Sequence, residues 1–146
     1  MAAKRLAYPA TRYNPSPLVD LTTRAERERL SASALKAFFN IAAHWQVRDE
    51  DARALLGGVS NGPYYQMKKN PDRVLDADTL LRISYLVGIF KALHILHSDA
   101  LADEWMRLPN ANRIFGGRTP LAYLLGGGLP AFETVRRLLD ARRGGV

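Results

Sequence analysis

The order of apolar and polar residues along the chain predicts an all-α protein. Between residues 31 and 46, apolar side chains recur at steps of three and four, which places one hydrophobic stripe on a helix. We expect Ser31 or Ser33 to cap that helix. Residues 76–97 are apolar on several sides, a pattern typical of a core helix or of one half of a dimer interface. The sequence contains no convincing strand pattern and no internal repeat.

Capping and helix-breaking residues divide the remaining chain into shorter elements. Thr23 begins a capping-box spacing, which predicts a short polar helix before the first apolar one. Asp49 is expected to cap the second helix and Ser60 the third, with Gly57-Gly58 in the turn between them. Further helices are expected over residues 76–97 (capped by Asp76 or Asp78), 101–108, 120–125 (capped by Thr119) and from Pro130 onward.

Composition and charge narrow the class of protein. The 146 residues are 47% apolar and 24% charged, which is typical of one globular domain or of two small helical subdomains that share a core. The absence of cysteine excludes disulfides, a cysteine nucleophile and thiolate metal sites. The net charge is +7, and twelve of the 21 basic residues lie before Asp76, against seven of the 14 acidic ones. This imbalance favours an anionic partner: a nucleic acid, an anionic membrane or an acidic protein.

Other features disfavour a secreted protein, a membrane protein or an enzyme. The first residues lack the apolar stretch of a secretory signal, and the most apolar segment is interrupted by Arg82 and Lys91, so we expect a cytoplasmic protein. His94 and His97 have a spacing that a metal ion can use, but Asp99 is poorly placed as a third ligand, and we expect no metal site. The nucleophile-elbow and dinucleotide-binding motifs are missing, so neither enzymatic activity nor a cofactor is expected.

A helix, a glycine-containing turn and a short basic helix over residues 49–69 have the spacing of a helix-turn-helix. In that motif the second helix enters the major groove of DNA, and its first residues contact base edges. The base-reading candidates are Ser60, Asn61, Tyr64 and Tyr65, and the phosphate-binding candidates are Lys68, Lys69 and Arg73. The N-terminus of the preceding helix is a further phosphate candidate. Because this geometry also occurs in plain helical bundles, an alternative is that Tyr64 or Tyr65 belongs to the core.

Several stretches resemble the Xre/MbcA/ParS-type antitoxins, which are partners of RES-domain toxins. The resemblance runs from about residue 30 to the end of the chain, outside the N-terminal arm. It is carried by residues 35–39 with Trp45, 52–57, 64–69 and 81–89 in the first part, and by residues 105–110, 115–121 and 135–145 in the second. The order Trp-Pro-Asn-Gly-Gly-Arg-Thr-Pro between residues 105 and 120 is the most specific of these features.

The resemblance implies a protein of two parts. The first part resembles an Xre-like domain that binds operator DNA and represses its own operon. The second resembles a domain that caps the toxin and occludes its NAD-degrading site. The toxin-binding candidates are Trp105, Arg118, Arg136, Arg137, Arg142, Arg143, Gly144, Gly145 and Val146. We expect the end of the chain to be thin and flexible enough to enter a cleft, where its arginines would pair with carboxylates or occupy a site for a charged dinucleotide. The alternative is a frayed, solvated tail.

The expected organisation follows from these patterns. It comprises a flexible arm over residues 1–30, a helix-turn-helix region over 31–75, a linking and dimerisation helix over 76–97 and a toxin-binding region over 98–146. A homodimer is expected from the apolar surplus of the linking helix, and it would offer two recognition helices to a palindromic operator. The alternative is a helical protein-binding antitoxin, or a transcriptional regulator, that lacks one of the two activities.

Overall fold

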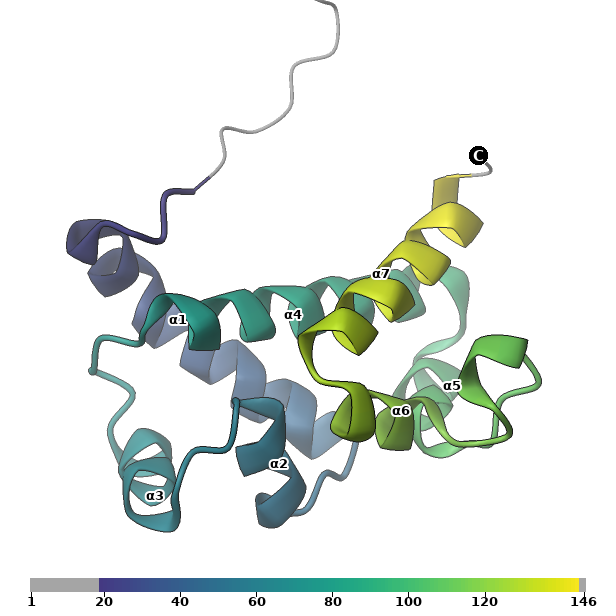
Figure 1. Ribbon diagram of the computed structural model, residues 1–146, viewed down its shortest axis with the longest axis horizontal. Coiled ribbons are helices and arrows are strands. Elements are labelled where there is room, and N and C mark those ends of the chain that lie inside the picture. Colours follow the sequence, from purple (N-terminus) through teal and green to yellow (C-terminus); the bar gives the residue numbers. More distant parts are fainter. Residues whose placement is uncertain (1–18, 145–146) are drawn as a thin grey trace, which may run out of the picture.

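The computed structural model describes residues 19–144, and the regular structure within this range is entirely helical (Figure 1). This confirms the predicted all-α fold. The helices are α1 (Arg24–His44), α2 (Asp49–Leu55), α3 (Asn61–Lys69), α4 (Ala77–Leu96), α5 (Asp99–Glu104), α6 (Pro120–Gly127) and α7 (Leu129–Gly144), with 3-10 turns η1 (Trp105–Arg107) and η2 (Arg113–Phe115).

The first helix is longer than its apolar stripe indicates. Helix α1 begins at Arg24, and the Thr23 hydroxyl caps it by accepting from the Glu26 amide at 3.4 Å. The helix start predicted at Thr23 is confirmed, whereas the predictions of an arm that extends to residue 30 and of a separate helix capped by Ser31 or Ser33 are wrong, because one helix runs through residues 24–44. The polar first turns stay helical because of this cap and because side chains three and four residues apart, such as Arg24 and Glu28, form ion pairs.

Ser31 joins α1 to the segment that precedes α4. Its buried hydroxyl donates to the Arg27 carbonyl and accepts from the Leu75 amide at 2.9 Å. A buried amide without a partner is costly, so this hydroxyl stabilises the entry into α4. The predicted cap is thus an interior hydrogen-bonding residue.

Helices α2 and α3 are joined by a turn that needs glycine. Gly57 and Gly58 have φ values of 101° and 88°, in the left-handed region that side chains disfavour. Arg48 occupies the cap position of α2, so the prediction that Asp49 is the cap is wrong by one residue. Ser60 precedes α3 as predicted, although its side chain makes no capping hydrogen bond.

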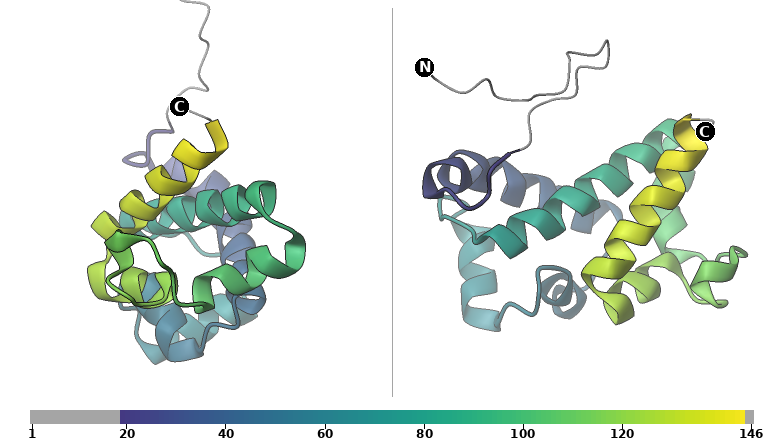
Figure 2. Two further views of the ribbon diagram at one scale, coloured as in Figure 1. Left: turned by 90° about the vertical axis from the view of Figure 1, so that its right-hand side faces the viewer. Right: turned by 45° about the horizontal axis from the view of Figure 1, so that its top comes forward.

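Helix α4 is the centre of the molecule and packs most extensively against α7 and α1 (Figures 1 and 2). Of the two predicted caps, Asp76 and Asp78, it is Asp76 that caps the helix, with its carboxylate accepting from the Thr79 amide at 2.7 Å. By length and composition α4 could cross a membrane, but eight of its residues are buried inside the protein, and core helices of soluble proteins share this composition. The apolar surplus of α4 is thus largely explained by packing within one chain.

Helix α7 approaches α4 closely at Gly88. A β-carbon placed at Gly88 would lie 1.4 Å from Nη1 of Arg136, so the guanidinium of Arg136 occupies the space that glycine leaves. Arg136 also donates from Nε to Asp140 at 2.9 Å. The glycine therefore makes room for an arginine from a helix almost fifty residues further along the chain.

The segment between α5 and α7 has a small aromatic core. The ring of Trp105 packs edge-to-face on Phe115 at a centroid distance of 5.9 Å, and Phe115 packs on Tyr123 at 5.3 Å. Gly116 and Gly117 both have positive φ and turn the chain between η2 and α6. The Thr119 hydroxyl caps α6 as predicted, accepting from the Ala122 amide at 3.1 Å.

Candidate functional site

Helix α3 has one buried side and one exposed side. Tyr64 and Met67 are buried in the core, whereas the intervening Tyr65 and Gln66 are exposed. Because residues three and four apart share a helix face, Gly62, Gln66 and Lys69 lie opposite the buried pair. This outward face is the part of α3 that is available for contact with a partner.

Tyr64 does not belong to the outward face. Only 1% of its surface is exposed, and its ring contacts that of Phe39 at a centroid distance of 5.8 Å. Its hydroxyl donates to Asp49 at 2.7 Å. Burial, together with this hydrogen bond, raises the pKa of the Tyr64 phenol above its ordinary value, so it stays protonated as a donor. The prediction that Tyr64 contacts bases is wrong, and the alternative that it is a core residue is correct.

The other candidates of this region are exposed on or beside α3. They are Ser60, Asn61, Tyr65, Lys68, Lys69 and Arg73. Arg73 comes from the segment after α3, but its Nη1 lies 3.5 Å from the Pro63 carbonyl, beside the first turn of the helix. The fold therefore gathers these six side chains around one short helix.

Gln66 is a candidate that the sequence reasoning missed. Its amide is exposed on the outward face of α3, between Gly62 and Lys69. A glutamine amide can make two hydrogen bonds with the major-groove edge of adenine. The spacing of Tyr64 and Met67 could have indicated this, because residues that lie between two positions of one buried helix face point outward.

The first turn of α2 is unsuited to a phosphate. It carries three consecutive carboxylates, Asp49, Glu50 and Asp51, which repel an anion and already complement the helix dipole. The helix is also only seven residues long. The hypothesis of a phosphate site at this N-terminus is not supported.

Asp49 instead binds groups from α3. Its carboxylate accepts from the Lys68 ammonium at 2.9 Å and from the hydroxyls of Tyr64 and Tyr65. The bonds from Lys68 and Tyr64 lower the pKa of the Asp49 carboxyl below its ordinary value. This carboxylate therefore connects the two helices of the helix-turn-helix.

Two toxin-binding candidates of the C-terminal region have structural contacts. Trp105 is 7% exposed and belongs to the aromatic core, so it offers little surface to a partner. Arg118 is exposed, but its Nε donates to the Phe115 carbonyl at 3.2 Å and its guanidinium lies 5.7 Å from the centroid of the Tyr123 ring. Arg118 therefore remains accessible to a partner, although contacts within the chain fix its position.

The arginines of α7 differ in their surroundings. Arg136 lies against Gly88 on the α4 side, which makes it a packing residue rather than part of a free basic end. Arg137 is exposed and pairs with Glu133, one turn earlier. Arg142 and Arg143 are exposed at the end of α7, where Arg143 lies 3.7 Å from Asp140. Gly144 ends α7, whereas Gly145 and Val146 lie outside the residues that the structure describes.

A polar cluster joins α1 to the C-terminal region. Nδ1 of His44 lies 3.0 Å from one Asp103 oxygen, and Nε2 of His94 lies 3.1 Å from the other. Nδ1 of His94 also lies 3.1 Å from Asp99. Each imidazole is thus oriented by carboxylates, and among residues 19–144 no group of three or more ligating side chains is arranged to hold a metal ion.

The Asp103 cluster predicts an acid-dependent stability. The hydrogen bond from His44 lowers the pKa of the Asp103 carboxyl below its ordinary value of 3.8. A lowered folded-state pKa contributes stability above the unfolded value and loses it as the pH falls through the folded value. We expect Asp103→Asn to reduce the free energy of unfolding at neutral pH but to have less effect near about pH 3. Urea unfolding of both proteins at the two pH values measures this; an equal loss at both would contradict it.

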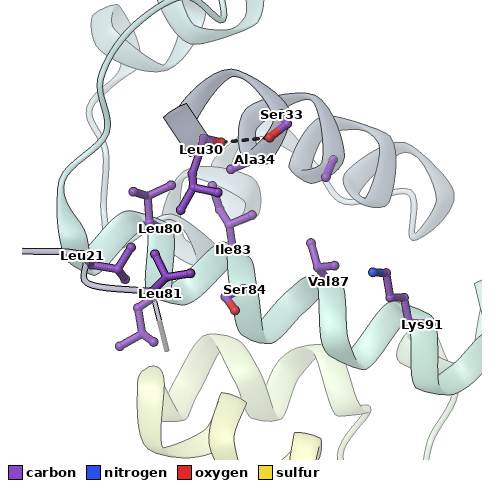
Figure 3. Close-up of a pocket in the computed structure, with 12 residues that line it drawn as sticks. Leu21, Leu30, Ser33, Ala34, Leu80, Leu81, Ile83, Ser84, Val87 and Lys91 are labelled. Carbon is purple, nitrogen blue, oxygen red and sulfur yellow. Dashed lines mark hydrogen bonds between the residues drawn. The ribbon is translucent and has the colours of Figure 1, made fainter. Parts of the chain in front are cut away.

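An apolar groove lies between α1 and α4 (Figure 3). Its volume is about 720 Å³. Leu21 and Leu81 lie toward one end and Lys91 toward the other, with Ser33 and Ser84 as further polar groups along it. None of the residues that line the groove lies on α3, so the groove is separate from the outward face of α3.

Together, the helical fold, the helix-turn-helix and the separate C-terminal region define an all-α protein with a helix-turn-helix motif. Residues 23–88 match the Antitoxin Xre-like helix-turn-helix domain, and residues 91–145 match the Antitoxin Xre/MbcA/ParS C-terminal toxin-binding domain. The "Uncharacterized protein y4oB" of Sinorhizobium fredii (strain NBRC 101917 / NGR234) is 39% identical over 112 residues, which cover 76% of this chain and 84% of that protein. No solved structure matches the chain. The chain belongs to the Xre/MbcA/ParS family of antitoxins.

The boundary between the two matched regions lies within α4. The helix-turn-helix match ends at residue 88 and the toxin-binding match begins at residue 91. Helix α4 therefore contributes to both regions, with its first part packed near α1 and the α2–α3 turn. The cluster of His44, His94 and Asp103 connects the two regions directly.

Proposed function

We propose that this antitoxin neutralises a RES-domain toxin by occluding its NAD-degrading site, and that it represses its own operon by binding operator DNA through α3. It acts by binding, in the cytoplasm, without an enzymatic step of its own. The observation that carries the proposal is the presence of both matched regions on one helical chain.

The outward face of α3 supports the DNA-binding half of the proposal. It combines an amide that can read a base edge, Gln66, with the exposed ammonium of Lys69. Arg73 adds a second cation beside the first turn of the helix. Cations at the edge of a groove-binding helix suit backbone phosphates, whereas Asn61, Tyr65 and Gln66 are in positions to contact bases.

The end of α7 supports the toxin-binding half. Leu139 is the last buried residue of the described chain, and the exposed Arg142 and Arg143 follow it. A basic helix end that is not needed for the core can enter a cleft on another protein. Its guanidinium groups would pair with carboxylates there, or occupy a site shaped for a charged dinucleotide.

The test separates the two halves. The antitoxin is mixed with labelled DNA from its own promoter in a mobility-shift assay, and it is co-expressed with a RES-domain toxin for co-purification and an NAD-consumption assay. A mobility shift, together with a co-purified toxin that no longer consumes NAD, supports both halves of the proposal. Co-purification without a shift favours the protein-binding alternative, and a shift without toxin inhibition favours a plain transcriptional regulator.

The partner proposal includes a second copy of the chain. The groove between α1 and α4 supports it, because the apolar side chain of Leu81 is 39% exposed at the groove. We expect Leu81→Glu to convert a dimer into a monomer, since a carboxylate cannot be buried in an apolar interface without a partner. Light scattering after gel filtration measures the mass.

A matched control exists for this substitution. Leu101 is 40% exposed and lies on α5, away from the groove, so Leu101→Glu makes the same chemical change elsewhere. The dimer proposal requires that only the Leu81 variant changes mass. A wild-type protein that is monomeric at high concentration would contradict the dimer proposal.

A further inference from the structure

The ammonium of Lys68 is held by a carboxylate of the neighbouring helix. Lys68 Nζ lies 2.9 Å from Asp49 Oδ1 and 5.5 Å from the centroid of the Tyr64 ring. Both side chains of the ion pair remain accessible, with 41% and 46% of their surfaces exposed. Lys69, the next residue, forms no ion pair within the described part of the chain. Two adjacent lysines thus differ in how much charge they offer to an anion.

Asp49 cannot easily give up its position. The same Oδ1 atom accepts from the hydroxyl of Tyr64 at 2.7 Å, and the ring of Tyr64 is fixed in the core. Moving the carboxylate away would leave that hydroxyl without a hydrogen-bond acceptor, which is costly in a buried environment. Any phosphate that approaches Lys68 must therefore compete with a carboxylate that is held in place.

We propose that Asp49 is an internal competitor of DNA phosphates for Lys68, and that it limits binding to DNA of arbitrary sequence. The proposal rests on the proposed function of α3 in DNA binding. Sequence-independent affinity comes from cations that replace the counterions of phosphates, so a lysine that is already paired contributes little to it. Operator binding then depends more strongly on base contacts from the outward face of α3.

The test uses four full-length proteins: wild type, Asp49→Asn, Lys68→Ala and the double variant. Asparagine keeps an oxygen that can accept from Tyr64 but loses the charge that holds Lys68. Fluorescence anisotropy measures binding to a duplex of random sequence and to the promoter duplex at several salt concentrations. Glu50→Gln is the matched control, because it neutralises a carboxylate in the same turn that has no bond to Lys68.

We expect Asp49→Asn to tighten binding to the random duplex by about five- to tenfold at about 0.1 M salt and to steepen the salt dependence by about 0.9 in log–log slope. The gain should be lost when Lys68 is alanine, and Glu50→Gln should produce a smaller change that does not depend on Lys68. The preference for the promoter duplex over the random one should fall in Asp49→Asn. A merely structural role of Asp49 would weaken binding and leave the slope unchanged.

Two outcomes overturn the proposal, and they can be told apart. If wild type and Asp49→Asn bind the random duplex equally, or if the gain persists without Lys68, then Asp49 is no competitor, although DNA binding itself stands. If no variant binds either duplex, DNA binding by α3 fails, and the proposal fails with it. Mass spectrometry of lysine acylation checks the ion pair independently, since Lys68 should react more slowly than Lys69 in wild type but not in Asp49→Asn.

Discussion

Lys69→Glu is expected to weaken binding of the promoter duplex by about tenfold or more at about 0.1 M salt. Lys69 is exposed on the outward face of α3, and its ammonium is not engaged in an ion pair within residues 19–144. The substitution removes one cation from the phosphates and adds a repulsive charge, so the log–log salt slope should also fall by about 1. Anisotropy titrations at several salt concentrations give both quantities.

Two comparisons make this result specific. Arg113→Glu changes the net charge equally on an exposed residue of η2 in the C-terminal region, and it should leave DNA binding nearly unchanged. Gln66→Ala should reduce affinity for the promoter by about 1–3 kcal/mol but leave the random duplex unaffected, because a base contact carries sequence information and a phosphate contact does not. Equal losses from Lys69→Glu and Arg113→Glu would show that α3 has no special role.

A chain that ends at Asp140 is expected to fold and to bind DNA normally but to leave the RES-domain toxin active. It retains the last buried residue, Leu139, and the bond between Arg136 and Asp140 that accompanies the contact with α4. It loses Arg142 and Arg143. Two charge-assisted hydrogen bonds at about 1.5–3 kcal/mol each correspond to a loss of roughly a hundredfold or more in toxin affinity.

Full-length protein with Arg142→Gln and Arg143→Gln separates charge from chain length. If the arginines carry the interaction, this variant should behave like the shortened chain in an NAD-consumption assay. If the helix end acts by filling space, the double variant should inhibit the toxin and the shortened chain should not. Complete inhibition by the shortened chain would move the toxin-binding surface to another part of the C-terminal region.

The aromatic and glycine residues of the C-terminal region explain why its sequence pattern is specific. Trp105, Phe115 and Tyr123 form a continuous packed series, and the two glycines after Phe115 make the turn into α6. The pattern that resembles a toxin-binding motif is therefore first of all a folding motif. A partner can contact only the exposed residues around this packed series, such as Leu108, which is 42% exposed.

The sequence alone was sufficient for the features that depend on neighbouring residues. The helical periodicity, the glycine turn before α3 and the caps Asp76 and Thr119 are local, because a cap or a turn is decided within three or four residues. The family could also be recognised from the order of residues. The start of α1 at Thr23 is also local, but its continuity with the apolar helix was missed because its polar first turns lack an apolar stripe.

Contacts between distant residues were decided by the tertiary structure. Tyr64 and Tyr65 are adjacent and chemically identical, yet the rotation of α3 against the core buries the first and exposes the second. Asp49 meets Lys68 across nineteen positions, and Arg136 fills the space above Gly88. A periodic pattern indicates that a helix has a buried side. It does not indicate which element packs on that side, because this depends on how the whole chain folds. The charged side chains that remain available to a partner therefore also depend on the whole fold.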